Sequence, residues 1–310
     1  MRRDKQALIT IFLALSVNFY TLPAQAQVSQ ITDASISIPR YGIKTNLPNR
    51  ERIVALANGS MEVLYALGLE RYVVGRDIAS SFKGVQRIPV VTNGHSISAE
   101  KVLRLKPTLL LVNKNSGPAK ALSLIRKSGV RIAVIPDAFS ITEMAAKYQS
   151  ILKAVNLSPN ADEARSLISG IPNETSITTN PAIRVAFLYL RGASSIYLMG
   201  GKGSGADSLI TAAGGIDVGR ELGYPAFSPI TSEAVVRSNP AILLVMIKGL
   251  DSVGGSKGLQ RLPGISQTEA GRFYNIVAVD DSLLLSFGPR TSILRENLTK
   301  VFASFAEQNV

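Results

Sequence analysis

The sequence predicts an α/β protein of two lobes, each built on a parallel sheet covered by helices. Short apolar strands alternate with helical segments along most of the chain, a pattern typical of such sheets. With 310 residues, the chain is long enough for two domains that each bury a core. Hydrophobic residues make up 46% and charged residues 18%, which is ordinary for a folded chain.

The first 26 residues have the three parts of a secretory signal peptide. Basic side chains at positions 2, 3 and 5 precede an apolar run over 7–17, and the small-x-small triplet 24–26 follows. An apolar run of about 11 residues is too short to cross roughly 30 Å of hydrocarbon as a helix. We therefore expect residues 1–26 to be removed after Ala26 and the protein to act in the periplasm.

Charge and cysteine content exclude several classes of function. The chain has no cysteine, so disulfides, thiolate metal sites, cysteine nucleophiles and a lipid-modified N-terminal cysteine are all excluded. The net charge is +12, which favours anionic ligands or surfaces. The basic residues are scattered singly, without aromatic-basic arrays, so nucleic acid is not an expected partner.

Residues 27–140 are expected to form the N-terminal lobe, after a polar lead that ends near Arg50. A serine at position 60 and a glycine at 68 are typical of the start and the end of a helix. The predicted strands are 52–56, 73–75, 108–112 and 132–135, and the predicted helices are 60–68, 98–105 and 119–128.

Residues 141–180 are expected to form a helical spine and a linker. Apolar residues recur at helical spacing over 141–155, and Ser158, followed by proline, predicts the start of a second helix. This helix meets Gly170 and Pro172, where it either ends or kinks.

The strand and helix pattern begins again in residues 181–310, the expected C-terminal lobe. The predicted strands are 184–189, 195–199, 241–246 and 277–279, and the predicted helices are 206–213, 232–238 and 291–306.

One pattern occurs in both halves of the chain. Residues 98–107 and 231–240 each read as a capped helix followed by a proline turn, and an apolar strand comes next. Glu100 and Glu233 occupy equivalent positions in the two segments. This repetition indicates two lobes of related local construction that face one another.

The sequence gives little support for an enzyme. A Ser–His triad would have to use the only histidine of the chain, and no local pattern identifies a nucleophile. The glycine-rich segment 200–205 matches neither a phosphate loop nor a dinucleotide fingerprint. We interpret it as a tight turn or a close approach of backbone to a ligand.

His95 lies in a loop, 91–97, that leads from a strand to a helix. Ligands of open α/β sheets bind at such turns, and neutral imidazole is a good iron ligand. The alternative is an ordinary solvated histidine.

Four segments resemble the haemin-binding periplasmic proteins of haem ABC importers, which are related to cobalamin- and siderophore-binding proteins. These segments are 59–68, 74–77, 98–107 and 203–215, and the likeness extends over 51–305. The resemblance implies two lobes joined by a rigid helical spine, the class III periplasmic binding protein fold. It also implies a monomer, without enzymatic activity, that binds haem between its lobes and delivers it to an inner-membrane ABC permease. An outer-membrane haem receptor would act upstream. The alternative ligand on this fold is a ferric siderophore or cobalamin.

The resemblance also suggests which residues hold the iron. One branch of the family uses a histidine in the loop that contains His95, together with a tyrosine of the C-terminal lobe. Tyr197 is the matching tyrosine, and Tyr224 is the reserve candidate. The alternative for Tyr197 is an ordinary strand aromatic with its hydroxyl bonded nearby.

Two further groups of residues are assigned as candidates. Arg76, Arg191 and Arg290 are candidates for the haem propionates, because a guanidinium can bind a carboxylate with two hydrogen bonds. By the resemblance, Glu100 and Glu233 dock onto arginines of the permease, one from each lobe. The alternative is that each is an acidic residue favoured at the start of a helix.

Overall fold

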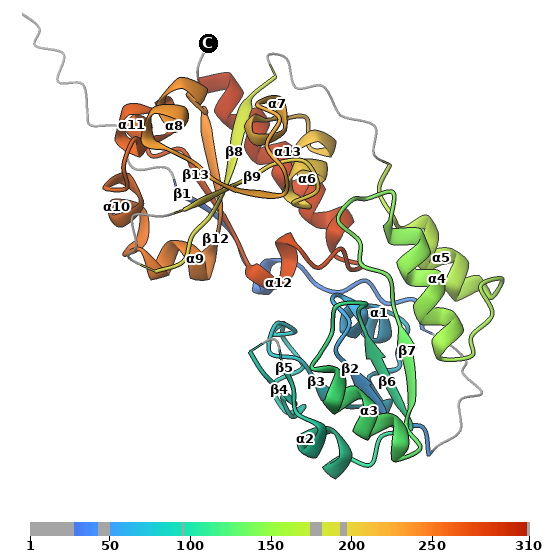
Figure 1. Ribbon diagram of the computed structural model, residues 1–310. Helices are drawn as coiled ribbons and strands as arrows, with labels where there is room; N and C mark the ends of the chain where they lie inside the picture. The colour runs from blue at the N-terminus through green and yellow to red at the C-terminus, as the bar shows by residue number, and fades with distance from the viewer. Residues whose placement is uncertain (1–27, 43–49, 95, 174–181, 193–196, 309–310) are drawn as a thin grey trace, which may run out of the picture.

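The computed structural model describes residues 28–42, 50–94, 96–173, 182–192 and 197–308 (Figure 1). It has two α/β lobes connected by helices on one side, as the sequence predicts. The predicted signal peptide, 1–26, lies outside the described residues. No helix within the described ranges combines the length and the apolar character needed to cross a bilayer.

The N-terminal lobe is built on a four-stranded parallel sheet in the order β3-β2-β6-β7. Its strands are β2 (Ile53–Ala55), β3 (Val73–Arg76), β6 (Leu109–Val112) and β7 (Arg131–Val134). Its helices are α1 (Ser60–Ala66), α2 (Ala99–Arg104) and α3 (Ala119–Lys127), and a short hairpin is formed by β4 (Thr92–Asn93) and β5 (Ser96–Ile97). Side chains of β2 alternate between two apolar clusters, so both faces of this sheet are covered.

The connection between the lobes contains α4 (Met144–Ala154) and α5 (Asp162–Ser169), which lie together on one side of the junction in Figure 1. The second helix begins later than predicted. Ser158 accepts a hydrogen bond from the backbone of Asn160 within a turn, and Ala161 is the residue that caps α5. At the other end the helix stops at Gly170, its C-cap residue. It therefore ends at this point rather than kinking.

The C-terminal lobe is built on a seven-stranded sheet in the order β1-β13-β12-β8-β9-β11, with β10 paired to β8. Its strands are β1 (Val28–Ile31), β8 (Arg184–Tyr189), β9 (Leu198–Gly200), β10 (Ile216–Asp217), β11 (Phe227–Pro229), β12 (Ile242–Met246) and β13 (Ile276–Val279). Its helices are α6 (Ala206–Ala212), α7 (Val218–Glu221), α8 (Ser232–Ser238), α9 (Ile247–Ser252), α10 (Gly255–Gln260), α11 (Glu269–Phe273), α12 (Asp281–Leu284) and α13 (Thr291–Gln308).

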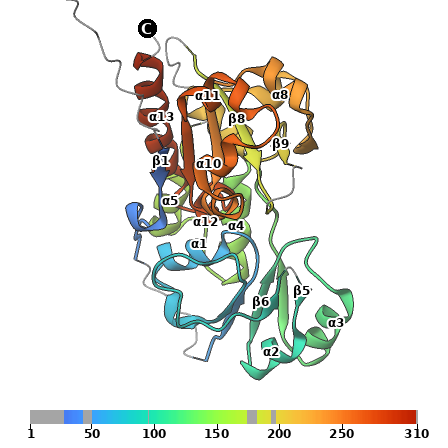
Figure 2. The same ribbon diagram turned by 90° about the vertical axis from the view of Figure 1, so that its left-hand side faces the viewer.

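The strand β1 departs from the expected division of the chain. It belongs to the polar lead, which was expected to be part of the N-terminal lobe. In the structure it pairs in parallel with β13, so that Val28 lies opposite Ile276. Figure 2 shows this first strand within the C-terminal lobe, beside α13. The described chain therefore passes from the C-terminal lobe to the N-terminal lobe and back.

The largest apolar cluster runs through both lobes. It includes Ile53 of β2, Tyr148 of α4, Leu167 of α5 and Phe302 of α13, all of which are at most 1% exposed. Burial of this much contiguous apolar surface ties the two sheets to the connecting helices.

Candidate ligand-binding cleft

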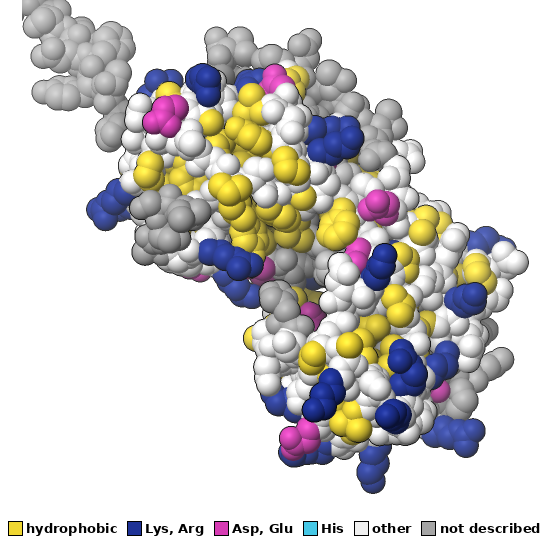
Figure 3. Space-filling view, viewed as in Figure 1, with side chains coloured by type: hydrophobic (Ala, Val, Ile, Leu, Met, Phe, Trp, Pro, Cys, Tyr) yellow, Lys and Arg dark blue, Asp and Glu magenta, His cyan; other side chains and the backbone are white. Residues whose placement is uncertain are grey.

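A cavity of about 570 Å³ lies between the two lobes. Residues that follow β2, β3, β6 and β7 line it from the N-terminal lobe. The last residues of β8 and β12 and the segment after β13 line it from the C-terminal lobe. The cavity thus lies outside the carboxyl ends of parallel strands in both sheets, where α/β proteins bind their ligands. The hollow between the lobes is visible in Figure 3.

Tyr189, the last residue of β8, provides a phenol to the cavity wall. Its hydroxyl oxygen accepts hydrogen bonds from Arg191, at 3.1 Å from Nε and 2.7 Å from Nη2. The guanidinium also lies 5.0 Å from the centre of the tyrosine ring. Phe227 packs its ring edgewise on the same tyrosine, with 5.3 Å between ring centroids. The phenol oxygen at the edge of the cavity therefore lies against a cationic donor.

Tyr189 was not among the ligands predicted from the sequence. The available signal was its position as the last residue of a predicted parallel strand, because strand ends form the binding edge of such sheets. Arg191, which was assigned to a propionate, instead has its guanidinium on the phenol oxygen.

The structure differs from the expectation for Tyr197. This residue precedes β9, is 3% exposed and packs in an apolar cluster of the C-terminal lobe. Its hydroxyl donates to the carbonyl of Pro263 at 2.6 Å, and burial raises its pKa to about 12. It is not among the residues that line the cleft. His95 lies outside the described residues, although its neighbours Gly94 and Ile97 line the cavity.

The other proposed ligand contacts are also directed elsewhere. Arg76 is bound to backbone of its own lobe, where it donates to the carbonyl oxygens of Asp77, Ser80, Val85 and Ile88. Arg290 is 1% exposed and forms ion pairs with Asp33 and Glu62. Tyr224 is partly buried and does not line the cleft.

Four residues form a buried polar group beneath the cleft, which we call the interlobe cluster: Glu62, Lys147, Ser286 and Arg290. Glu62 Oε1 accepts hydrogen bonds from Arg290 Nη2 at 2.7 Å and from Ser286 Oγ at 3.2 Å. Lys147 Nζ donates to the carbonyl oxygen of Ser286 at 2.6 Å. Burial lowers the pKa of Lys147 to about 8, against the attraction of Glu62 and Asp137. The cluster joins α1, α4 and the segment before α13.

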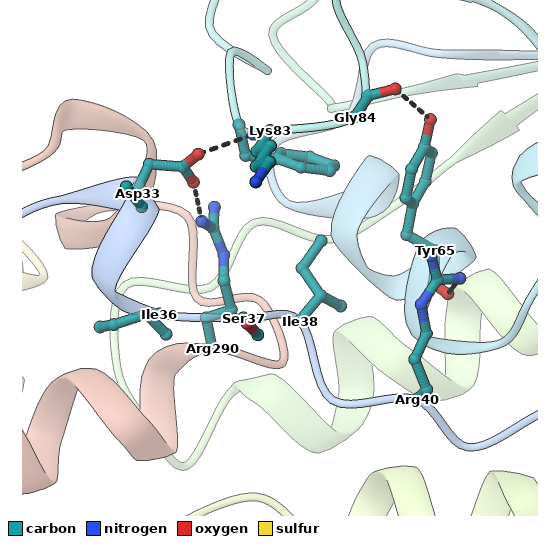
Figure 4. Close-up of a pocket in the computed structure, with 11 residues that line it drawn as sticks. Asp33, Ile36, Ser37, Ile38, Arg40, Tyr65, Lys83, Gly84 and Arg290 are labelled. Carbon is teal, nitrogen blue, oxygen red and sulfur yellow. Dashed lines mark hydrogen bonds and ion pairs between the residues drawn. The ribbon is translucent and has the colours of Figure 1, made fainter.

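A second cavity of about 280 Å³ adjoins this cluster (Figure 4). Asp33, which follows β1, forms an ion pair with Arg290 and accepts a hydrogen bond from the backbone of Lys83 at 2.6 Å. On the opposite wall the Tyr65 hydroxyl donates to the carbonyl of Gly84 at 3.2 Å. These contacts tie the segment after β1 to the N-terminal lobe.

Glu100 and Glu233 occupy matching positions on the two lobes. Each lies in the first turn of a helix, after Ser98 and Thr231, whose hydroxyl oxygens accept the capping hydrogen bonds of α2 and α8. The Glu100 side chain is 77% exposed and pairs with Arg104 at 2.5 Å. Glu233 is exposed, and hydrogen bonds from its own backbone and nearby hydroxyls hold its pKa below the usual value. Both carboxylates are accessible to a partner.

Two α/β lobes that face each other across a cavity, with a helical connection on one side, define a cleft-type ligand-binding protein. A family model described as "Periplasmic binding protein" matches residues 53–283. The chain belongs to this family.

Solved structures with similar folds cover most of the chain. The periplasmic haem-binding protein RhuT from Roseiflexus sp. RS-1, in apo form, is 34% identical with a TM-score of 0.75, covering 83% of this chain and 99% of that chain. A structure of the haem-binding protein HmuT is 27% identical with a TM-score of 0.78, covering 89% of this chain and 97% of that chain.

Curated relatives are also transport or binding proteins by their names. An uncharacterized ABC transporter substrate-binding lipoprotein of Bacillus subtilis (strain 168) is 24% identical over 247 residues, which are 77% of this chain and 76% of that protein. A vitamin B12-binding protein of Vibrio vulnificus (strain YJ016) is 30% identical over 83 residues, or 30% of its length.

Proposed function

We propose that the protein captures ferric haem in its interlobe cleft in the periplasm and delivers it to an inner-membrane ABC permease, without catalysis. The observation that carries this proposal is the Tyr189 phenol at the cavity edge, with two hydrogen bonds from Arg191 on its oxygen. Phenolate is a hard anionic ligand that suits oxidised iron, and a guanidinium donor stabilises its charge.

Solved structures of a relative support the same residues. Structures of HmuT include variants in which a histidine, a tyrosine or an arginine two positions beyond that tyrosine is replaced. Tyr189 and Arg191 have this spacing. We therefore propose Tyr189, in place of Tyr197, as the iron ligand from the C-terminal lobe. His95 remains the proposed ligand from the N-terminal lobe.

Haemin titration of the purified protein, followed by its absorbance spectrum, tests the proposal. We expect a saturable Soret band. Tyr189→Phe removes only the ligand oxygen and should change the band and weaken binding by about tenfold or more. Tyr197→Phe is the matched control. It should leave the spectrum unchanged and cost about 1 kcal/mol of stability, because only the bond to Pro263 is lost.

Two results would contradict these assignments. An absence of saturable haemin binding would contradict haem as the ligand. If Tyr197→Phe changed the spectrum and Tyr189→Phe did not, the iron ligand would be Tyr197, as first expected from the sequence. His95→Ala in the same titration tests the ligand from the N-terminal lobe, and an unchanged spectrum would count against it.

Cobalamin is the second candidate ligand, because part of the chain is similar to a vitamin B12-binding protein. Titration with cyanocobalamin under the same conditions separates the two. We expect no saturable change in its absorbance, since the phenol and arginine pair suits a ferric centre with an open position.

We also propose that Glu100 and Glu233 dock the loaded protein onto basic residues of the permease. Both carboxylates are exposed and lie on matching helices of the two lobes. Replacing both by lysine should leave haemin affinity unchanged and abolish stimulation of permease ATPase activity in proteoliposomes. Unchanged stimulation would show that docking uses another surface.

A further inference from the structure

The cleft is lined by carboxylates from four separate segments of the chain. They are Glu62 in α1, Asp77 after β3, Asp137 after β7 and Asp281 at the start of α12. Among the described residues that line the cavity, none is lysine or arginine. Figure 3 shows acidic side chains where the two lobes face each other. This is unexpected in a chain of net charge +12.

Most of this acidic charge is not neutralised by nearby cations. Glu62 is paired with Arg290, which also pairs with Asp33. Within the described ranges, no lysine or arginine forms an ion pair with Asp77, Asp137 or Asp281.

The contacts of the aspartates are made to backbone groups. Asp77 accepts hydrogen bonds from the backbone of Ala79 and Ser80, each at 3.2 Å, and Asp281 accepts one from the backbone of Lys248 at 3.1 Å. Lys147 attracts Asp137, but its ammonium donates to Ser286 beneath the cleft rather than lining the cavity.

The surroundings of these acids weaken solvent screening. Burial raises the pKa of both Asp77 and Asp137 above the usual value, which indicates that their charges are poorly hydrated. A further negative charge placed beside them would therefore be repelled strongly.

Exposed apolar side chains also line the cleft. Ile78 and Phe139 of the N-terminal lobe line the cavity and are 55% and 51% exposed. On the other lobe, Phe227 packs on Tyr189 and is 39% exposed. A flat apolar ring can pack on these side chains, whereas an anionic margin placed beside the carboxylates would be repelled.

We propose that the acidic floor, defined as Glu62, Asp77, Asp137 and Asp281, is a charge filter that sets ligand orientation and specificity. It admits a porphyrin whose carboxylates lie together on one edge, with that edge directed out of the cleft. It rejects ligands that present negative charge on every edge, including polyanionic ferric siderophores. This inference rests on the proposed haem-binding function and adds the class of porphyrin that the cleft selects.

The test compares haemin with ferric coproporphyrin I, which carries one carboxylate on each of its four pyrrole rings. In absorbance titrations of the full chain, we expect coproporphyrin to bind at least about tenfold more weakly than haemin. The double variant Asp77→Asn and Asp137→Asn should tighten coproporphyrin binding by about tenfold, a clearly larger change than its effect on haemin affinity. If these nearly isosteric substitutions restore coproporphyrin binding, the negative charge of the cleft, and not the size of the ligand, is what weakens binding.

A matched control removes two exposed acids outside the cleft, Asp251→Asn and Glu307→Gln. It changes net charge equally and should alter neither affinity. The proposal is overturned if coproporphyrin binds as tightly as haemin, or if the cleft variant and the control affect both ligands alike. Asp137→Asn alone, expected to give a smaller gain in the same direction, keeps the test decisive if the double variant unfolds. Failure of the haem-binding proposal would appear separately, as absent haemin saturation in the unaltered protein.

Discussion

Tyr189 and Tyr197 are close in the sequence, but their hydroxyl groups have opposite surroundings. The Tyr189 oxygen receives two hydrogen bonds from a cation at the cavity edge. The Tyr197 hydroxyl donates to a backbone carbonyl inside the lobe, and burial raises its pKa to about 12. The first oxygen therefore lies at the cavity beside a cationic donor, whereas the second is committed to a carbonyl inside the lobe. Local sequence alone could not distinguish them, because the difference depends on which way each strand end faces.

Asp217 provides a prediction at the residue scale. One of its oxygens caps α7 by accepting a hydrogen bond from the backbone N–H of Arg220. Its other oxygen is buried without a partner in the described structure. Burial raises its pKa to about 7, and nearby Asp207 adds to the effect. Between about pH 4 and 7 the folded state therefore keeps a proton that the unfolded state releases, so stability falls as pH rises.

Asp217→Asn should remove this pH dependence and keep the capping acceptor. The variant is expected to gain stability relative to the unaltered protein as pH rises from 5 to 8, by at most about 3 kcal/mol. Urea unfolding at both pH values measures the difference. Equal slopes of stability against pH in the two proteins would contradict the assignment.

Close backbone packing in the C-terminal lobe provides a prediction at the element scale. A Cβ atom on Gly219 of α7 would lie 1.8 Å from the carbonyl oxygen of Gly200 in β9, so the helix approaches the strand only through glycine. Gly219→Ala should destabilise the protein by about 2–4 kcal/mol, measured by urea unfolding.

Gly249→Ala is the matched control for that substitution. This glycine also lies in a helix, α9, but its added Cβ would meet Leu190 at an ordinary 3.4 Å. The control should be neutral or stabilising by up to about 1 kcal/mol. Equal losses in both variants would mean that the contact with Gly200 is not the cause.

Most elements were predictable from the sequence because, within each segment, the spacing of the apolar residues and the capping residues indicate the same element. The helix after Ser98 and the strand over 109–112 are examples, with a hydroxyl cap and four buried residues respectively. The start of α5 was wrong because Ser158 and the proline after it suit a turn as well as a helix start. The strand β1 was missed because its polar sequence becomes a strand only by pairing with β13, far along the chain.

At the scale of the whole molecule, the interlobe cluster links the two lobes through buried polar contacts. The four residues of the cluster come from α1, α4 and the segment before α13. Because these segments are far apart in the sequence, the sequence did not predict that their side chains would meet. The predicted division at residues 140 and 180 remains an expectation, apart from β1, which lies in the C-terminal sheet.

Lys147 provides a prediction at this scale. Its pKa is lowered to about 8 by burial, whereas the unfolded chain holds this proton to about 10.5. Stability should therefore rise with pH between these values, because the unfolded state binds the extra proton. Relative to Lys147→Met, the unaltered protein should gain up to about 3 kcal/mol from pH 7.5 to 10, measured by urea unfolding. A difference that stays constant over this range would contradict the buried, depressed lysine.

The placement of β1 has a consequence for the order in which the molecule assembles. Among the described strands, β1 is synthesised first and its partner β13 last. The N-terminal sheet has all four of its strands long before that and can form while β1 waits unpaired. Completion of the C-terminal sheet then brings the first described strand back to the lobe that the last described residues build. An edge strand that waits in this way is a natural point of engagement for a chaperone.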